Sequence, residues 1–267
     1  MAKNRKRLLN TALTVFLGTT TVICWAHGRL VAADTPAPGK QVEQTLSLGQ
    51  DNQPDCGYQL FLPAGYSQAD KQWPMILFLH GRGESYGPLS LVKKWGPPKI
   101  CDQDPKYPYI VVSPQCPGKE SWSRERQQDI LVKLLDHIVS TYRVDPARIY
   151  LTGLSMGGYG SWRLAADHPH RFAAVVPVCG GGNPEDADKL KTLPIWVFHG
   201  DQDRAVPFER SVQMVDAIRK AGGTTIRFTS YEGFGHNCWT ATYATPDMYK
   251  WLNRQKRTPS PPATDKR

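Results

Sequence analysis

The sequence predicts an α/β domain with a mostly parallel sheet and helices on both faces. Short apolar runs alternate with longer amphipathic segments from Val42 to Leu252, a pattern typical of parallel strands that are buried on both faces. No long linker or change of composition interrupts this range. We therefore expect one domain rather than two.

Seven short apolar runs are predicted to be strands, since each has the length and composition of a buried strand. They are residues 60–62, 75–79, 109–112, 149–151, 173–178, 195–198 and 225–228. Four segments are predicted to be helices. The clearest is 127–142, in which apolar residues recur at helical spacing; the others begin after Ser155 and close near His168, span 208–221 before Gly222, and span 247–253.

The ends of the chain differ from this alternating region. Residues 1–33 combine a basic start, an uncharged run and the small residues Ala32 and Ala33, which predicts a cleaved secretory signal and leaves an uncleaved membrane anchor as the alternative. Residues 34–54 are predicted to hold a linker and the first strand, and 55–253 the main folded domain. The proline-containing basic segment 254–267 is predicted to be a disordered tail.

The formal net charge of +9 is concentrated at these ends. Residues 34–253 contain 23 basic and 23 acidic residues, so the folded region is predicted to be neutral. A surface that binds nucleic acid needs clustered Lys and Arg on the fold itself. We therefore expect no nucleic-acid partner, and after removal of the signal no stable membrane partner.

Five cysteines remain after the leader, and their spacing matches no zinc motif. We expect no metal and no cofactor. Cys179 and Cys238 both lie in predicted loops at the carboxyl edge of the sheet, which suggests a disulfide between them in an exported protein.

The stretch 153–157, Gly-Leu-Ser-Met-Gly, lies between a predicted strand and a predicted helix. A serine on such a strand–turn–helix junction is typical of a nucleophile held in strained backbone, where neighbouring glycines permit close helix packing. Ser155 is therefore the candidate nucleophile, and a structural turn is the alternative.

A serine nucleophile needs a base, and the base needs a carboxylate that orients it. In this architecture the acid and then the base follow the serine along the chain, each after a strand. The loop after 195–198 offers Asp201 and Asp203, of which we prefer Asp203 because it stands further into the loop. His236 follows the next strand and is the candidate base. For the oxyanion, we expect the backbone N–H groups of Met156 and Arg82.

The motifs LFLHGRGES, YIVVSPQCP, RIYLTGLSMGGYGSW, FAAVVPVCGGG, WVFHGDQDRAVP and GHNCW occur in this order. Together they resemble the α/β-hydrolase superfamily, and more narrowly exported esterases related to polyhydroxybutyrate depolymerases, feruloyl esterases and phospholipase/carboxylesterase-like proteins. The resemblance covers about residues 55–253 and implies an eight-stranded, mostly parallel sheet with a minimal lid at 180–192. It also implies a triad of Ser155, Asp203 and His236. Arg82 departs from the small residue that many relatives carry.

The resemblance implies a serine hydrolase that cleaves carboxylic esters, among them acyl or feruloyl esters of polysaccharides. The alternatives are a peptidase of the prolyl-oligopeptidase type that uses the same triad, and a silent hydrolase-fold binding protein. Trp239, three residues after His236, and Trp122 are candidate substrate-binding residues. The sequence does not predict the oligomeric state.

Overall fold

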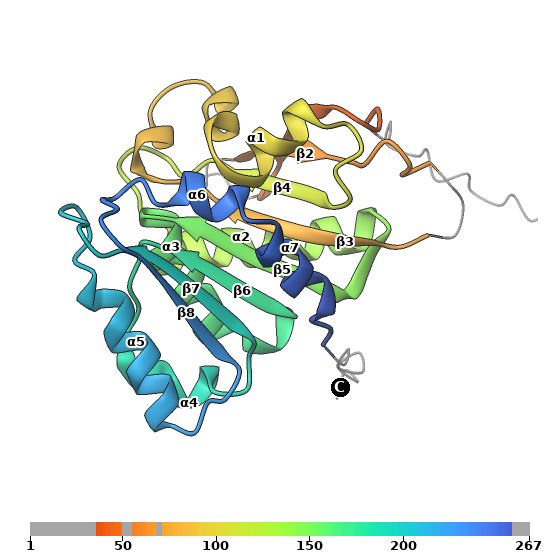
Figure 1. The fold of residues 1–267 in the computed structure, drawn as a ribbon. Coiled ribbons are helices and arrows are strands. Elements are labelled where there is room, and N and C mark those ends of the chain that lie inside the picture. Colours follow the sequence, from red (N-terminus) through yellow and green to blue (C-terminus); the bar gives the residue numbers. More distant parts are fainter. Residues whose placement is uncertain (1–35, 50–54, 68–70, 258–267) are drawn as a thin grey trace, which may run out of the picture. The chain divides into compact units, whose positions relative to one another are not determined.

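The computed structural model describes residues 36–49, 55–67 and 71–257. The predicted signal segment 1–33 and residues 258–267 of the predicted tail lie outside these ranges. The described chain forms one eight-stranded sheet in the order β1-β2-β4-β3-β5-β6-β7-β8, with helices on both faces (Figure 1). The predicted α/β fold with a mostly parallel sheet is confirmed.

Two kinds of strand pairing build this sheet. β1 pairs antiparallel with β2, β2 pairs antiparallel with β4, and every other neighbouring pair is parallel. All five parallel pairs lie on one side of β2, so the carboxyl ends of their strands meet at one edge of the sheet. The strands are β1 Gln41–Leu46, β2 Cys56–Phe61, β3 Trp73–Leu79, β4 Ile110–Pro114, β5 Val144–Leu154, β6 Ala174–Val178, β7 Ile195–Gly200 and β8 Ile226–Tyr231.

The helices divide between the two faces because alternate strand residues point to opposite sides. One apolar core packs the sheet against α2 Glu125–Thr141, α3 Met156–Asp167, α4 Ala187–Leu190 and α5 Glu209–Lys220. The other packs it against α1 Gly96–Gln103, α6 Trp239–Ala244 and α7 Pro246–Arg254. Short 3-10 turns lie at Arg82–Ser85, Leu89–Lys94, Pro169–Arg171 and Pro184–Asp186.

Each predicted strand and helix appears in the structure with a boundary shift of a few residues. The first strand, expected within 34–54, is β1. Between β6 and β7 the described chain holds only a 3-10 turn and the four-residue α4, which agrees with a minimal lid. The sequence interpretation missed α1, α4 and α6.

Residues 254–257 of the predicted disordered tail are part of the described fold. Arg254 is the last residue of α7. Gln255 accepts a hydrogen bond from the Tyr150 hydroxyl, and the Arg257 N–H donates to the Ala147 carbonyl at 3.0 Å. These contacts order residues 255–257 against β5.

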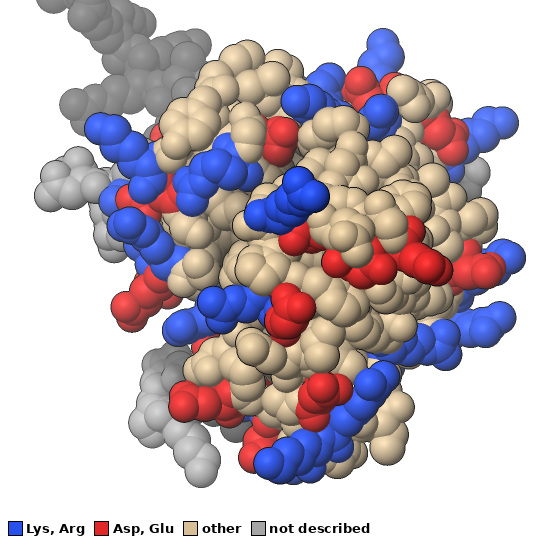
Figure 2. All heavy atoms as spheres, turned by 60° about the vertical axis from the view of Figure 1, so that its left-hand side comes forward, with Lys and Arg blue, Asp and Glu red and all other residues tan. Residues whose placement is uncertain are grey.

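Charged side chains of both signs are interspersed on the face drawn in Figure 2. This distribution agrees with the neutral balance of residues 34–253. Among the helices in the described ranges, none has both the length and the hydrophobicity needed to cross a bilayer.

Candidate active site

Ser155 lies on the turn between β5 and α3, with φ 52° and ψ −117°. Residues with side chains rarely adopt such backbone, which costs about 1–3 kcal/mol. A Cβ on Gly153 would lie 2.3 Å from the Gly157 carbonyl oxygen, and one on Gly157 would lie 1.9 Å from the Leu79 carbonyl oxygen. The two glycines are therefore required by the close packing of α3 against the strands.

The structure brings the three predicted residues of the triad together. The Nε2 atom of His236 lies 2.9 Å from the Ser155 hydroxyl oxygen, and its Nδ1 atom lies 2.7 Å from Asp203 Oδ2. They come from three loops at the carboxyl edge of the sheet, after β5, β7 and β8. In this arrangement the ring can accept the serine proton at Nε2 while the carboxylate holds Nδ1–H.

The two aspartates of the loop after β7 have different partners. Asp203 Oδ1 accepts hydrogen bonds of 2.9 Å from the N–H groups of Ala205 and Val206, and its Oδ2 faces His236. Asp201 Oδ1 accepts from the Gly233 N–H at 2.8 Å. Asp201 thus links the loop after β7 to the loop after β8, and of the two aspartates only Asp203 bonds to His236.

The Asp203 side chain is buried, yet the pKa of its carboxyl is lowered. Burial by itself would raise its pKa. Hydrogen bonds from His236 and from the N–H groups of Val206 and Ala205, with the His236 charge, outweigh burial and lower the pKa below its ordinary value. An ionised carboxylate is the form that orients an imidazole and stabilises it when it becomes charged.

A cavity of 330 Å³ opens beside Ser155 and His236. The loop after β3 forms one wall through Gly81 and Arg82. The exposed Arg82 side chain donates to the carbonyls of Gly118 and Glu120. It is thereby held against the loop 117–120, while residue 82 lines the same cavity as Ser155.

Trp239 lies where the sequence placed it, beside the candidate base. Its ring meets the His236 ring edge-to-face at 5.2 Å and the Trp95 ring at 5.9 Å. Both tryptophans line the cavity with Ser155. They present an aromatic wall to whatever occupies it.

Trp122 was expected near substrate, and the structure contradicts this. Its side chain is 1% exposed, its Nε1–H donates to the His80 carbonyl, and it packs in the core between α2 and α3. It does not line the cavity with Ser155. Aromatic residues of this size are most stable when buried, and here the indole N–H finds a buried partner.

The sequence interpretation missed two charged residues of the cavity wall, Glu84 and Lys94. Glu84 is 5% exposed, and burial raises the pKa of its carboxyl against the opposing charge of Lys94. Glu84 lies two residues after Arg82 in the same loop, and this short spacing could have placed it at the cavity from the sequence.

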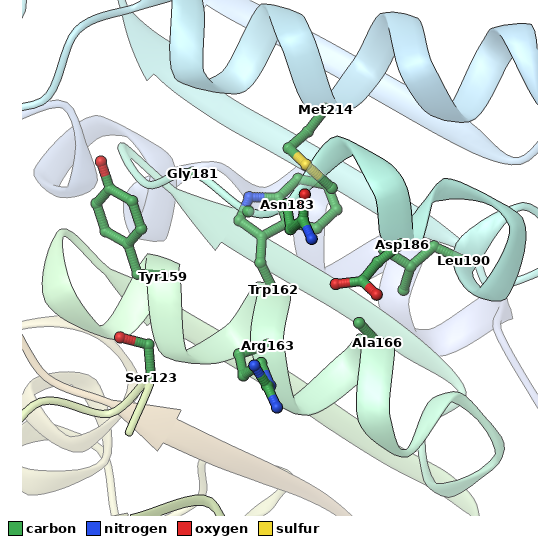
Figure 3. A pocket seen from close by; sticks show the side chains of 11 residues that line it. Ser123, Tyr159, Trp162, Arg163, Ala166, Gly181, Asn183, Asp186, Leu190 and Met214 are labelled. Carbon is green, nitrogen blue, oxygen red and sulfur yellow. The ribbon is translucent and has the colours of Figure 1, made fainter. Parts of the chain in front are cut away.

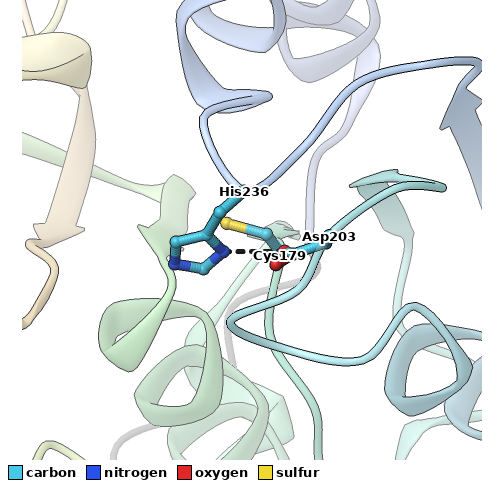
Figure 4. A group of neighbouring side chains, drawn as sticks. All are labelled: Cys179, Asp203 and His236. Carbon is cyan, nitrogen blue, oxygen red and sulfur yellow. Dashed lines mark hydrogen bonds and ion pairs between the residues drawn. The ribbon is translucent and has the colours of Figure 1, made fainter.

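Cys179, Asp203 and His236 form a cluster in which one possible ligand atom from each lies within 4.8 Å of the others (Figure 4). Two ligands on one zinc ion lie about 3.3 Å apart, given the metal–nitrogen and metal–oxygen lengths. The 2.7 Å between His236 and Asp203 is shorter than this. Burial also raises the pKa of the Cys179 thiol well above its ordinary value, and a protonated thiol is a poor ligand. The geometry fits a hydrogen-bonded pair rather than a metal site.

The expected disulfide between Cys179 and Cys238 is not present. Both are buried free thiols, and burial, together with a hydrogen bond that the Cys179 thiol donates to the neighbouring Cys238 side chain, raises the pKa of Cys179. The prediction that the two side chains lie near each other is correct, and the prediction that they form a disulfide is wrong.

A second cavity, of 240 Å³, lies along α3 (Figure 3). It is lined by Tyr159 and Trp162 on α3 and by Asn183 and Asp186 on the segment after β6. None of Ser155, Asp203 and His236 lines it, so the nucleophile–base pair belongs to the first cavity.

Three features define the fold and site of an α/β hydrolase. The sheet is mostly parallel, the serine lies on a turn between a strand and a helix, and the acid and base lie on later loops at the same edge. The dienelactone hydrolase family model matches residues 103–250. The chain belongs to the dienelactone hydrolase family.

Relatives with esterase names accompany this match. The chain is 26% identical over 141 residues to a bifunctional acetylxylan esterase/xylanase of Neocallimastix patriciarum, covering 51% of this chain and 20% of that protein. It is 26% identical over 214 residues to a protein of Aspergillus terreus named "Probable feruloyl esterase C", covering 76% and 75%. The chain spans a quarter or less of some curated relatives, among them NocK, named as an esterase, of Nocardia uniformis at 24%.

Solved structures show the same fold. A thermostable esterase is 32% identical, with a TM-score of 0.71 over 83% of this chain and 64% of that one. A ferulic acid esterase is 21% identical, with a TM-score of 0.62 over 80% and 96%. The second likeness concerns the fold alone.

Proposed function

We propose that the protein is a serine hydrolase that cleaves carboxylic esters through an acyl-enzyme. The observation that carries this proposal is the continuous hydrogen-bonded arrangement of Ser155, His236 and Asp203 at the carboxyl edge of the sheet, with Ser155 on a strained turn. The esterase names of the relatives support it.

In the proposed reaction, the Ser155 oxygen attacks the ester carbonyl carbon while its proton moves to His236 Nε2. The N–H groups of Met156 and Arg82 hold the oxyanion of the tetrahedral intermediate. Collapse breaks the bond to the alcohol oxygen, which takes the proton from His236. Water then gives a proton to His236 and attacks the acyl-enzyme carbonyl. Collapse of this second intermediate breaks the bond to the Ser155 oxygen, which takes the proton back from His236, and the acid is released.

Esters of acylated polysaccharides are the proposed substrate class, and export is the proposed destination. Trp95 and Trp239 form an aromatic wall beside Ser155, against which a flat or sugar-like group of a substrate can pack. The relatives named for acetylxylan and ferulate esters point to the same class. The basic and uncharged pattern of residues 1–33 supports export.

Turnover on a substrate panel tests this proposal. The panel contains nitrophenyl acyl esters, methyl ferulate, acetylated xylan and proline-containing peptide amides, with Ser155→Ala as the control. We expect ester cleavage that Ser155→Ala reduces by at least about 1,000-fold. Faster cleavage of amides than of every ester would establish the peptidase alternative, and no turnover of any member would support a silent binding protein.

A further inference from the structure

Asp203 has a second histidine partner that the proposed reaction does not use. His199, the fifth residue of β7, has a fully buried side chain, and its Nε2 atom lies 3.1 Å from Asp203 Oδ2. The same Nε2 atom lies 3.1 Å from the Val206 carbonyl oxygen, and Nδ1 lies 2.7 Å from the Ser211 hydroxyl oxygen. Both ring nitrogens therefore have fixed partners.

These partners select one tautomer of His199. Nε2 faces a carboxylate oxygen and a carbonyl oxygen, which only accept hydrogen bonds, so Nε2 carries the hydrogen. Burial lowers the pKa of His199, which favours the neutral ring, and Nδ1 then accepts the Ser211 hydroxyl hydrogen. The Ser211 hydroxyl also donates to the Gly180 carbonyl oxygen at 3.0 Å, so its one hydrogen is shared between this oxygen and Nδ1.

Two histidines thus share one carboxylate oxygen. Asp203 Oδ2 accepts from His236 Nδ1 at 2.7 Å and from His199 Nε2 at 3.1 Å, while Oδ1 accepts from two backbone N–H groups. The Cys179 thiol is a further titratable group near the Asp203 carboxylate, and Cys238 neighbours Cys179.

We propose that His199, whose Nε2–H faces the Asp203 carboxylate, is a positioning residue for Asp203 and limits how strongly that carboxylate stabilises the charged form of His236. The hydrogen-bonded chain then runs from Ser211 through His199, Asp203 and His236 to Ser155. A donor on Oδ2 draws negative charge away from the His236 side of the carboxylate and fixes its rotation. This role rests on the proposed function.

Loss of the His199 hydrogen bond is expected to shift the pH profile in one direction. Asp203 would become more basic, so the charged form of His236 would gain stability and the neutral base needed for attack would appear only at higher pH. The acid limb of the kcat/KM profile therefore moves to higher pH, by up to about one unit. Without the His199 hydrogen bond the Asp203 carboxylate is also held less firmly in one orientation, which lowers kcat about tenfold. KM stays unchanged because His199 touches no substrate.

The test compares His199→Leu, which fills the space without a donor, with His199→Gln, whose amide nitrogen reaches about as far as Nε2 and can donate to Asp203. His170→Gln, at an exposed histidine, is the matched control. The readouts are kcat, KM and the pH profile on a nitrophenyl ester, with thermal unfolding to verify folding. We expect the shift and the loss in His199→Leu, substantial rescue in His199→Gln, and wild-type behaviour in His170→Gln.

A folded His199→Leu with the wild-type kcat and pH profile would overturn the proposal, as would a His199→Gln variant as impaired as His199→Leu. If His199→Leu does not fold, Ser211→Ala decides. This variant removes the partner of Nδ1 and so loosens the His199 ring, which must shift the acid limb in the same direction by a smaller amount; an unchanged profile overturns the proposal. A wild-type protein inactive on every ester would contradict the proposed function instead, so the two failures are distinguishable.

Discussion

His80 illustrates at the scale of one residue how fixed partners determine a charge state. Its Nδ1 atom lies 2.6 Å from the Gly81 carbonyl oxygen, and its Nε2 atom accepts the Cys116 N–H at 2.9 Å. A proton on Nε2 would therefore face another N–H group. Burial, opposed by the Gly81 hydrogen bond and aided by the Arg82 charge, lowers the pKa of His80 to about 4.

This neutral histidine makes stability depend on pH. The unfolded chain takes up the proton as the pH falls through about 6.5, whereas the folded protein stays neutral down to about 4. The stability is thus fully present above pH 6.5 and is lost as the pH falls toward 4. We expect the free energy of unfolding in urea to fall by about 2 kcal/mol from this residue between pH 7 and pH 5.

His80→Gln is the comparison for this prediction. The variant is less stable at pH 7, but its decrease between pH 7 and pH 5 is smaller than that of the wild type by about 2 kcal/mol. Equal decreases in the two proteins would show that folding does not lower the pKa of His80.

The serine turn is the clearest feature at the scale of elements, because it fixes β5, α3 and β3 against one another. Ser155 donates its backbone N–H to the Val178 carbonyl at 3.0 Å, and Gly157 leaves no space between α3 and the end of β3. The turn geometry follows from backbone contacts on both sides rather than from the serine itself.

Gly157→Ala is accordingly expected to destabilise the protein by about 3 kcal/mol or more, since the added Cβ would lie 1.9 Å from a backbone oxygen that cannot move freely. Gly57→Ala is the matched control, because its Cβ would meet only the Leu89 side chain at an ordinary 3.5 Å. Thermal unfolding measures both. A Gly157→Ala variant as stable as Gly57→Ala would refute the close packing of the turn.

The elements that the sequence did not predict have local reasons. Helix α1 begins with Gly96, Pro97 and Pro98, residues that indicate a loop, although proline is tolerated in a first helical turn, where its missing N–H costs nothing. Helix α6 has six residues, several of them aromatic or β-branched, and no helical period that six residues could display. Tertiary contacts stabilise both.

The site was more predictable than these helices because order along the chain constrains it. Ser155, Asp203 and His236 each follow a strand whose carboxyl end reaches the same edge, so their proximity follows from the topology. Trp122 and His199 could not be placed in this way. A tryptophan in a loop can line a cleft or fill a core, and a histidine at a strand end reveals its partners only when the loops fold over it.

In the described fold as a whole, the positions of Ser155, Asp203 and His236 relative to one another depend on the sheet that joins their loops. The nucleophile, acid and base come from loops after three different strands, and separate apolar cores on the two faces fix those strands. The folded region between the charged ends is neutral. The proposed chemistry lies at this edge of the sheet.

Covalent labelling of Ser155 with a fluorophosphonate tests the central claim most directly. The probe phosphonylates a serine oxygen that a neighbouring base has activated. Intact-mass measurement of the folded wild-type protein is predicted to show one adduct, mapped to Ser155, with none in Ser155→Ala and none after denaturation. A folded wild-type protein that stays unlabelled, or that carries its adduct at another residue, would contradict the account.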